Sequence, residues 1–189
     1  MAQVVGTVTL HRPFMVRNIR GFALIDLIFV CGIVGVLASI ALPRLTLAKS
    51  TAGTASAIGS MRAITSAQLT FALTCGAGFY APSLTVLGTA PPGSNDPFIG
   101  QGLGVAAAVT KAGYIVQIEA SPYGGAPASC NGLAAGDAGQ GYKAGADPVE
   151  PANPRHFATN ANNVIFEHTS TLFPTMPEAG DPATGHPLQ

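Results

Sequence analysis

An uninterrupted apolar segment from Phe22 to Leu42 constrains the fold of this chain more than any other feature. It holds 21 residues, and only Asp26 among them carries a charge. As an α-helix it would be about 31 Å long, close to a hydrocarbon core of about 30 Å. A carboxylate costs about 2.5–3.5 kcal/mol at the centre of a membrane helix, and less near an end. The segment therefore predicts a membrane-spanning helix, and Asp26 must bring a gain that offsets its cost.

The residues before the apolar segment form a positively charged leader, with His11, Arg12, Arg17 and Arg20. A secretory signal peptide would place a small-x-small cleavage site after its apolar part. Here the apolar segment is followed by "LPRLTLAKS", which lacks that pattern. We therefore expect the segment to stay in the mature protein. The positive charges before it weakly favour a cytoplasmic N-terminus.

The helix is expected to continue beyond the membrane segment, because residues 44–75 are rich in Ala, Ser, Thr and Leu and contain no proline. Steps of three and four place their apolar residues on one helix face. Gly53 and Gly59 weaken this pattern locally, whereas Gly76 and Gly78 provide a stop signal. One helix is expected over about 22–75, with residues 22–42 in the membrane and 43–75 as its amphipathic continuation. The predicted face consists of Ile58, Met61, Ile64, Ala67, Phe71 and Cys75.

Residues 76–172 contain patterns typical of short strands. Apolar and polar residues alternate over 114–120, which predicts a half-buried strand. Residues 141–149 give a weaker strand pattern, and residues 155–170 predict a hairpin around the turn "NANN". We expect a globular head with three or four antiparallel strands. The tail 173–189 carries four prolines and is expected to be extended or disordered.

Charge and cysteine content narrow the possible functions. The chain is 48% hydrophobic and only 10% charged, and a chain that lacks the three leader arginines has six basic against nine acidic side chains. This weakly charged, slightly acidic composition argues against nucleic-acid binding, which needs clustered cations.

The chain has three cysteines, and Cys31 lies in the apolar segment. Cys75 and Cys130 lie outside it and predict one disulfide in an exported domain; the alternative is two unpaired buried thiols.

The junction "RGFALIDLIFV" resembles the class III signal of type IV pilins and type II secretion pseudopilins. In that family a dedicated aspartic peptidase cuts after the glycine and methylates the new N-terminus. The resemblance implies removal of residues 1–21, a cut between Gly21 and Phe22, and N-methyl-Phe22 as the first mature residue. The family normally has Glu five residues after the cut, where this chain has the shorter Asp26.

Further positions carry the same resemblance over roughly residues 17–170. Pro43 falls where the family has a helix-kinking proline, and Gly35 where many members have a glycine. The resemblance therefore implies a helix kink at these two positions. The segments "KAGYIVQIEASP" and "GYKAGADPV" are similar to the head domains of bacterial type IV pilin-like proteins. The resemblance implies an α+β fold of the type IV pilin kind, with one long N-terminal helix packed on a small antiparallel sheet.

The resemblance also implies a role for Asp26. Cleavage leaves an ammonium group on Phe22, and two opposite charges in apolar surroundings attract strongly. Pairing of Asp26 with the Phe22 amine of a neighbouring subunit would set the register of a filament. The alternative is a local interaction of Asp26 with the positive end of its own helix.

The resemblance also implies partners and a location. The implied partners are other copies and related pilins, the prepilin peptidase, the inner-membrane assembly platform and membrane lipid. The implied location is the bacterial inner membrane before assembly, as a single-pass protein, and a periplasm-spanning or extracellular filament afterwards.

The leading function is a structural subunit of a type IV pilus or a pilus-like filament. The alternatives are a pseudopilin of a type II secretion system and a minor tip pilin for adhesion or DNA uptake. A tip pilin would need a basic or aromatic patch, and Lys111, Lys143 and Arg155 are too few for one. The sequence shows no Ser-His-Asp pattern, phosphate loop or paired acids, so we expect no enzyme and no cofactor.

No metal site is expected either. His156, His168 and His186 are scattered along the chain, no C-x-x-C occurs, and each histidine is interpreted as a surface or strand residue. Asp137, Asp147 and Glu150 lie in Gly-rich loops and could bind calcium, as some pseudopilins do. They are spread out without a dense pattern of oxygen ligands, which argues against a calcium site.

Overall fold

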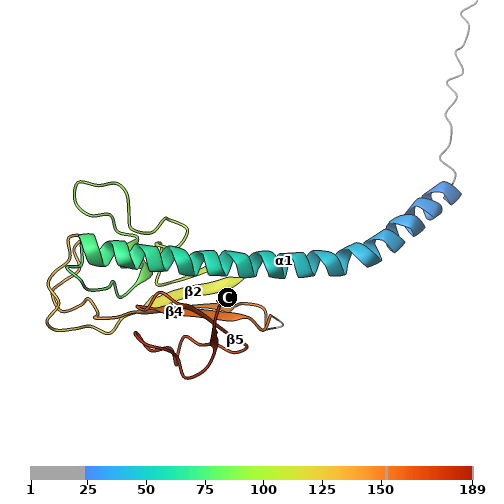
Figure 1. Cartoon of the computed structure of the whole chain (residues 1–189). Helices are drawn as coiled ribbons and strands as arrows, with labels where there is room; N and C mark the ends of the chain where they lie inside the picture. Colours follow the sequence, from blue (N-terminus) through green and yellow to red (C-terminus); the bar gives the residue numbers. More distant parts are fainter. Residues whose placement is uncertain (1–23, 152, 189) are drawn as a thin grey trace, which may run out of the picture. The chain divides into compact units, whose positions relative to one another are not determined.

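The protein is described here by a computed structural model that covers residues 24–151 and 153–188. The chain divides into two compact units, with the boundary between Pro43 and Arg44. We call the described part of the first unit, residues 24–43, the apolar unit, and the second, from Arg44 onward, the head unit. Figure 1 follows the helices and strands along the chain.

Helix α1 spans Leu24–Thr74, in agreement with the expected long helix. Residues 22 and 23, with which we expected the helix to begin, lie outside the described residues. Pro43 lies inside α1, where it has no backbone N–H for the helical ladder. Proline therefore removes one hydrogen bond from α1 at the boundary between the two units.

The part of α1 in the head unit is amphipathic, as its spacing predicted. Met61, Ile64 and Phe71 are fully buried, and Ala57, Ala67 and Cys75 extend the same face. The buried side chain of Gln68 also lies on this part of α1. Its amide donates to the carbonyl of Ala81 at 2.8 Å and accepts from the Ala81 N–H at 2.9 Å, which holds the chain where it returns after α1.

The end of α1 is fixed by glycines. Gly76 N–H and Cys75 N–H both donate to the Phe71 carbonyl, and Gly78, at φ 93°, donates to Ala72. A Cβ on Gly76 would lie 2.4 Å from the Phe79 carbonyl oxygen, so only glycine fits there. Gly76 and Gly78 thus end the helix as the sequence predicted.

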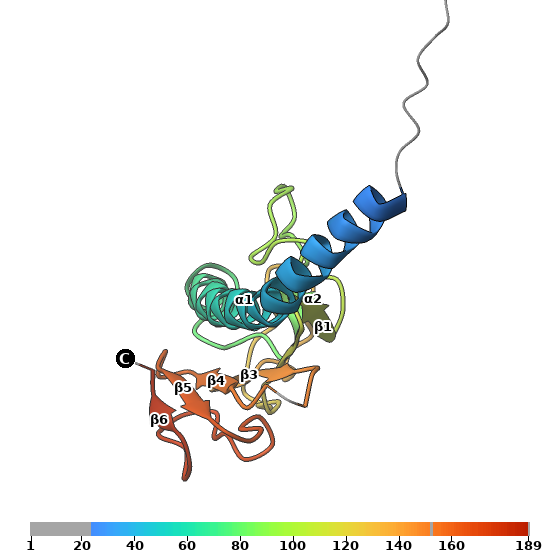
Figure 2. The same ribbon diagram turned by 90° about the vertical axis from the view of Figure 1, so that its right-hand side faces the viewer.

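The head unit contains a fully antiparallel sheet of six strands in the order β1-β2-β3-β4-β5-β6, so the expectation of three or four strands was wrong. Figure 2 shows β3, β4, β5 and β6 side by side. The predicted strands are β2, β3 and the β4–β5 hairpin. The strand bounds are β1 Ala108–Lys111, β2 Tyr114–Glu119, β3 Lys143–Pro148, β4 His156–Asn160, β5 Ile165–His168 and β6 His186–Pro187.

The two unexpected strands have weak local signals. β1 belongs to the run "VAAAVTK", and alanine has a low preference for strands. Its turn to β2 consists of Ala112 and Gly113, at φ 49° and 83°, rather than the more recognisable Asn-Gly pair. β6 has only two residues and exists because it pairs with β5.

The main core lies between α1 and the near face of the sheet. Met61, Ile64 and Phe71 of α1 belong to the same buried cluster as Val116 of β2 and Phe157 of β4. Leu84 and Leu87 of the short helix α2, Leu84–Leu87, extend this cluster. The side chain of Ser83 caps α2 by accepting from Val86 N–H at 3.4 Å. The segment after α1 is therefore ordered around a short helix.

The C-terminal tail covers the outer face of the sheet, which we define as the face that carries Ala158 and points away from α1. Ala158 and Phe166 of the sheet form a second buried cluster with Met176 of the tail and with Leu172, which directly precedes it. The Asn160 amide donates to the carbonyls of Pro177 and Gly180, at 3.1 and 2.6 Å. The prolines predicted an extended or disordered tail, and the described tail is packed and hydrogen-bonded rather than disordered.

Cys75 and Cys130 form a disulfide, the pairing that the sequence predicted. It connects the end of α1 to the Gly-rich loop between β2 and β3. The neighbouring Asn131 donates from its side chain to the carbonyls of Val86 and Thr89, at 2.7 and 3.1 Å. One loop therefore holds both α1 and α2 in place.

Candidate functional site

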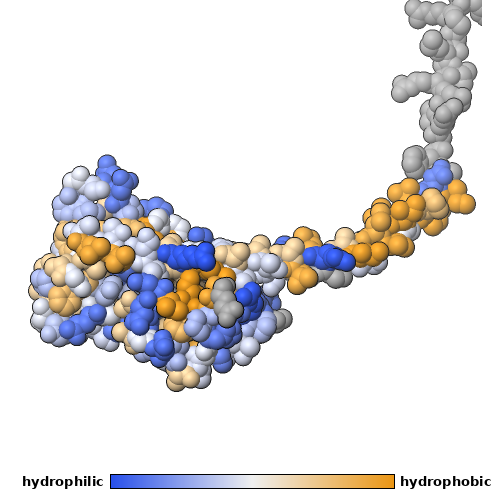
Figure 3. Space-filling model, in the orientation of Figure 1, coloured by the Kyte–Doolittle hydropathy of each residue, from blue (hydrophilic) through white to orange (hydrophobic). Residues whose placement is uncertain are grey.

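The apolar unit exposes large hydrophobic side chains along its whole described length. Their exposure ranges from 46% at Ile33 to 74% at Leu24. In Figure 3 these residues form a nearly continuous hydrophobic surface. Within the described chain, α1 is the one helix long and apolar enough to cross a membrane, by length and composition. A surface of this kind marks a membrane or protein contact, because soluble monomers rarely expose large contiguous apolar patches.

Asp26 lies in the first turn of α1, inside this apolar surface. Its side chain is exposed, and no described residue forms a hydrogen bond or an ion pair with it. The position is compatible with a dipole interaction at the helix N-terminus. Gly21 and Phe22, the predicted cleavage and methylation positions, lie outside the described residues. The proposed partner of Asp26 would come from another subunit.

Gly35 and Cys31 lie on the same exposed stretch of α1. A Cβ on Gly35 would meet nothing within 4 Å, so packing inside this chain gives no reason for a glycine there. Cys31 is a free, exposed thiol. A kink at Gly35 and Pro43 stays a prediction.

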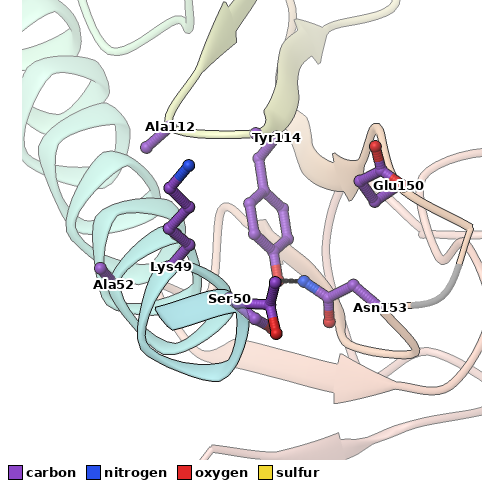
Figure 4. Close-up of a pocket in the computed structure, with 10 residues that line it drawn as sticks. Lys49, Ser50, Ala52, Ala112, Tyr114, Glu150 and Asn153 are labelled. Carbon is purple, nitrogen blue, oxygen red and sulfur yellow. Dashed lines mark hydrogen bonds between the residues drawn. The ribbon is translucent and has the colours of Figure 1, made fainter. Parts of the chain in front are cut away.

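The head unit has a groove where α1, the β1–β2 turn and the loop after β3 meet. Its volume is about 720 Å³. Figure 4 shows Lys49, Tyr114, Glu150 and Asn153 around it. The lining residues are Thr46, Lys49, Ser50, Ala52, Gly53, Ala112, Gly113, Tyr114, Glu150 and Asn153. Glu150, which was considered for calcium, lines this groove, whereas none of the predicted assembly, kink and disulfide residues that the structure describes does. The sequence offered no pattern that could find the groove.

Tyr114 supports one wall of the groove. Its hydroxyl lies 3.1 Å from Thr54 Oγ1 of α1 and accepts from the Asn153 side chain at 2.9 Å, as Figure 4 shows for Asn153. A Cβ on Gly53 would lie only 2.6 Å from the Ala112 carbonyl oxygen, so glycine allows α1 to approach the β1–β2 turn closely. The groove combines small uncharged side chains with one cation, Lys49, and one anion, Glu150.

The three acidic residues considered for calcium do not come together. Glu150 lines the groove, Asp137 lies in the Gly-rich loop, and Asp147 pairs with His156 Nδ1 at 2.7 Å. Within residues 24–151 and 153–188, no group of three or more His, Cys, Asp and Glu side chains is arranged to hold a metal ion.

An ion pair joins β5 to the segment before β4. Arg155 Nη2 donates to Glu167 Oε2 at 2.8 Å, and Nε binds the other carboxylate oxygen. This hydrogen bonding lowers the pKa of Glu167 and raises the pKa of Arg155. Arg155, one of the three cations judged too few for a basic patch, is thus occupied by a carboxylate.

The structure also brings together two histidines that the sequence left scattered. His156 and His168 are register partners on β4 and β5. The sequence contains the signal for this pairing, because both flank the "NANN" turn of the predicted hairpin, but only a defined register makes them opposite each other.

Comparison of the chain with protein-family models, with curated proteins and with solved structures finds no match.

Proposed function

We propose that this protein is the structural subunit of a type IV pilus or a related pilus-like filament. The observation that carries the proposal is the exposed apolar unit, which has a single carboxylate in its first turn. The residues around Gly21 support it, because "RGFALID" resembles a cleavage and methylation signal. Before assembly, the apolar part of α1 would anchor the subunit in the membrane. In the filament, the same surface would be buried against other copies.

Asp26 would set the stagger between subunits. An ammonium group on Phe22 and the Asp26 carboxylate are each unfavourable alone in apolar surroundings, and both costs fall when the two groups meet. A subunit that slipped along the filament axis would leave both charges unpaired, so only the correct register is favourable.

Replacement of Asp26 by Asn tests the proposal. The amide keeps the size of the side chain and removes its charge, so the monomer should still enter the membrane and be cleaved. Filament assembly should fail, because removing one partner of a buried ion pair costs about 3–5 kcal/mol. The measurement compares the amount of subunit in sheared filaments with the amount in the membrane fraction.

Two further variants serve as controls. Asp26→Glu restores the carboxylate that the family normally carries and should assemble at least as well as the natural chain. Asp96→Asn removes an exposed carboxylate from the head unit and should leave assembly unchanged. Efficient entry of Asp26→Asn subunits into filaments would refute the role of the carboxylate.

A further inference from the structure

The part of α1 in the head unit carries a short hydrophobic ridge on its exposed side. Leu69 and Leu73 are 46% and 75% exposed. Arg62 and Ser66 are exposed as well, and steps of four, three and four residues place all four side chains on one helix face. We call this face the leucine ridge. It points away from the core of its own chain, because α1 buries its opposite face there.

The groove at the start of the head unit offers an apolar surface in which such a ridge fits. Its small lining residues, Ala52, Gly53, Ala112 and Gly113, leave a volume of about 720 Å³ open. Pockets that bury most of a bound molecule have volumes of about 300–1,000 Å³. Ser50 and Gly53 also lie on the face of α1 that continues into the core, so the groove and the leucine ridge occupy opposite faces of the helix.

Charged side chains beside the two surfaces are complementary. Arg62 belongs to the leucine ridge and Glu150 lines the groove, and both are exposed. The three ion pairs among the described residues include neither of them. In Figure 4, Glu150 lies on the far side of Tyr114 from α1, where a side chain from another molecule can reach it.

The direction of the two surfaces also agrees. Arg62 precedes Leu69 by seven residues, about 10 Å of helix. Val149 N–H donates to the Gly113 carbonyl, so Glu150 lies past the end of the sheet that faces the start of the head unit. In two copies that run in the same direction, Arg62 of one copy can therefore meet Glu150 of the other while the leucines enter the groove.

We propose that the leucine ridge of one subunit docks in the groove of a second copy of this chain. The inference rests on the proposed function and names a head contact that holds the filament together. Because the two surfaces differ, the contact is heterologous, and such contacts repeat along an open helix when the rotation does not close. Residues 69–73 of one copy lie level with residues 46–53 of the other, which staggers the two subunits by about 30 Å.

Cysteine cross-linking in sheared filaments tests the contact directly. The full chain carries Cys31→Ala, which removes the free thiol, together with Ser50→Cys in the groove and Leu73→Cys in the leucine ridge. Positions 50 and 73 are 23 residues apart on α1, about 35 Å, so a bond between them within one chain is impossible. Mild oxidation should give dimers and a ladder of higher oligomers on non-reducing gels.

The matched control combines Thr51→Cys with Leu73→Cys in the same Cys31→Ala chain. Thr51 is the next residue of α1, is exposed and does not line the groove, so this pair should stay largely monomeric. If filaments form and the pair at positions 50 and 73 links no better than the control, the contact is overturned and the proposed function stands. If the natural chain forms no filaments, both are overturned.

Reversal of the two charges gives a second test. Arg62→Glu brings two carboxylates together and Glu150→Lys brings two cations together, so each should lower the amount of subunit in sheared filaments at least about tenfold. The double variant restores opposite charges and should recover most of that amount. Both positions are exposed, and circular dichroism in detergent checks that each variant is folded. Normal assembly of the single variants, or a double variant that assembles as poorly as they do, would overturn the contact.

Discussion

At the scale of single residues, the hydroxyl groups of two core tyrosines differ in their hydrogen bonding. The Tyr114 hydroxyl has Thr54 and Asn153 as partners. The Tyr142 hydroxyl is the one buried side-chain oxygen or nitrogen without a hydrogen-bond partner among the described residues. Burial raises the pKa of Tyr142 to about 12, and the nearby Thr65 opposes this rise. An unpaired buried hydroxyl is costly, so its removal should be tolerated.

We expect Tyr142→Phe to leave the free energy of unfolding at neutral pH unchanged or raise it by up to about 1 kcal/mol. The difference in stability between the natural chain and the variant should grow at alkaline pH. Free tyrosine ionises near pH 10, so between about pH 10 and 12 the unfolded chain loses a proton that the folded chain keeps. The folded state is destabilised by about 1.4 kcal/mol per pH unit over that range. Unfolding of the full chain in detergent, followed at a series of pH values, should show this loss in the natural chain and not in the variant.

At the scale of elements, two glycines of α1 should respond in opposite ways to alanine. Gly53→Ala would place a Cβ 2.6 Å from the Ala112 carbonyl oxygen, so α1 and the β1–β2 turn must separate. We expect a loss of about 1–3 kcal/mol. At Gly59 a Cβ would meet nothing within 4 Å, and alanine should raise stability by about 0.5–1 kcal/mol through its helix propensity. Thermal unfolding of both variants checks the sign, and a shift in the same direction for both would contradict this account of α1 packing.

The disulfide acts between elements as well. Cys75 and Cys130 are 55 residues apart, and closing a loop of this length is worth about 4 kcal/mol in the chain-entropy model. Denaturant unfolding of the Cys75→Ser, Cys130→Ser double variant should show a loss of this order. Thiol alkylation under denaturing conditions should label Cys31 alone before reduction, and all three cysteines after it. Labelling of Cys75 and Cys130 without reduction would show that the chain lacks the bond.

At the scale of the whole molecule, the proposed filament requires processing of the N-terminus. We expect mass analysis of the membrane fraction to find a chain that begins at N-methyl-Phe22, because Gly21 precedes the apolar segment as in a class III signal. Gly21→Leu replaces the small residue before the expected cut with a large one, so the peptidase should no longer cleave there. The leader should then stay attached, and no filaments should form. A mature chain that begins at another residue would remove the basis for the family resemblance.

The sequence by itself determined the features that repeat along a short stretch of chain. The apolar segment, the buried stripe of α1 and the β4–β5 hairpin follow from hydrophobic periodicity and turn residues, which act between neighbours. Asp26 was found for the same reason, because a lone charge in an apolar helix is visible without any fold.

Only the tertiary structure decided which distant residues meet. β6 forms because the tail returns to β5, and the groove exists because Gly53 of α1 reaches the β1–β2 turn. His156 and His168 lie opposite each other because of the hairpin register, and a shift by one residue would turn one ring to the other face. Such contacts depend on the packing of the whole head unit, and no local pattern encodes them.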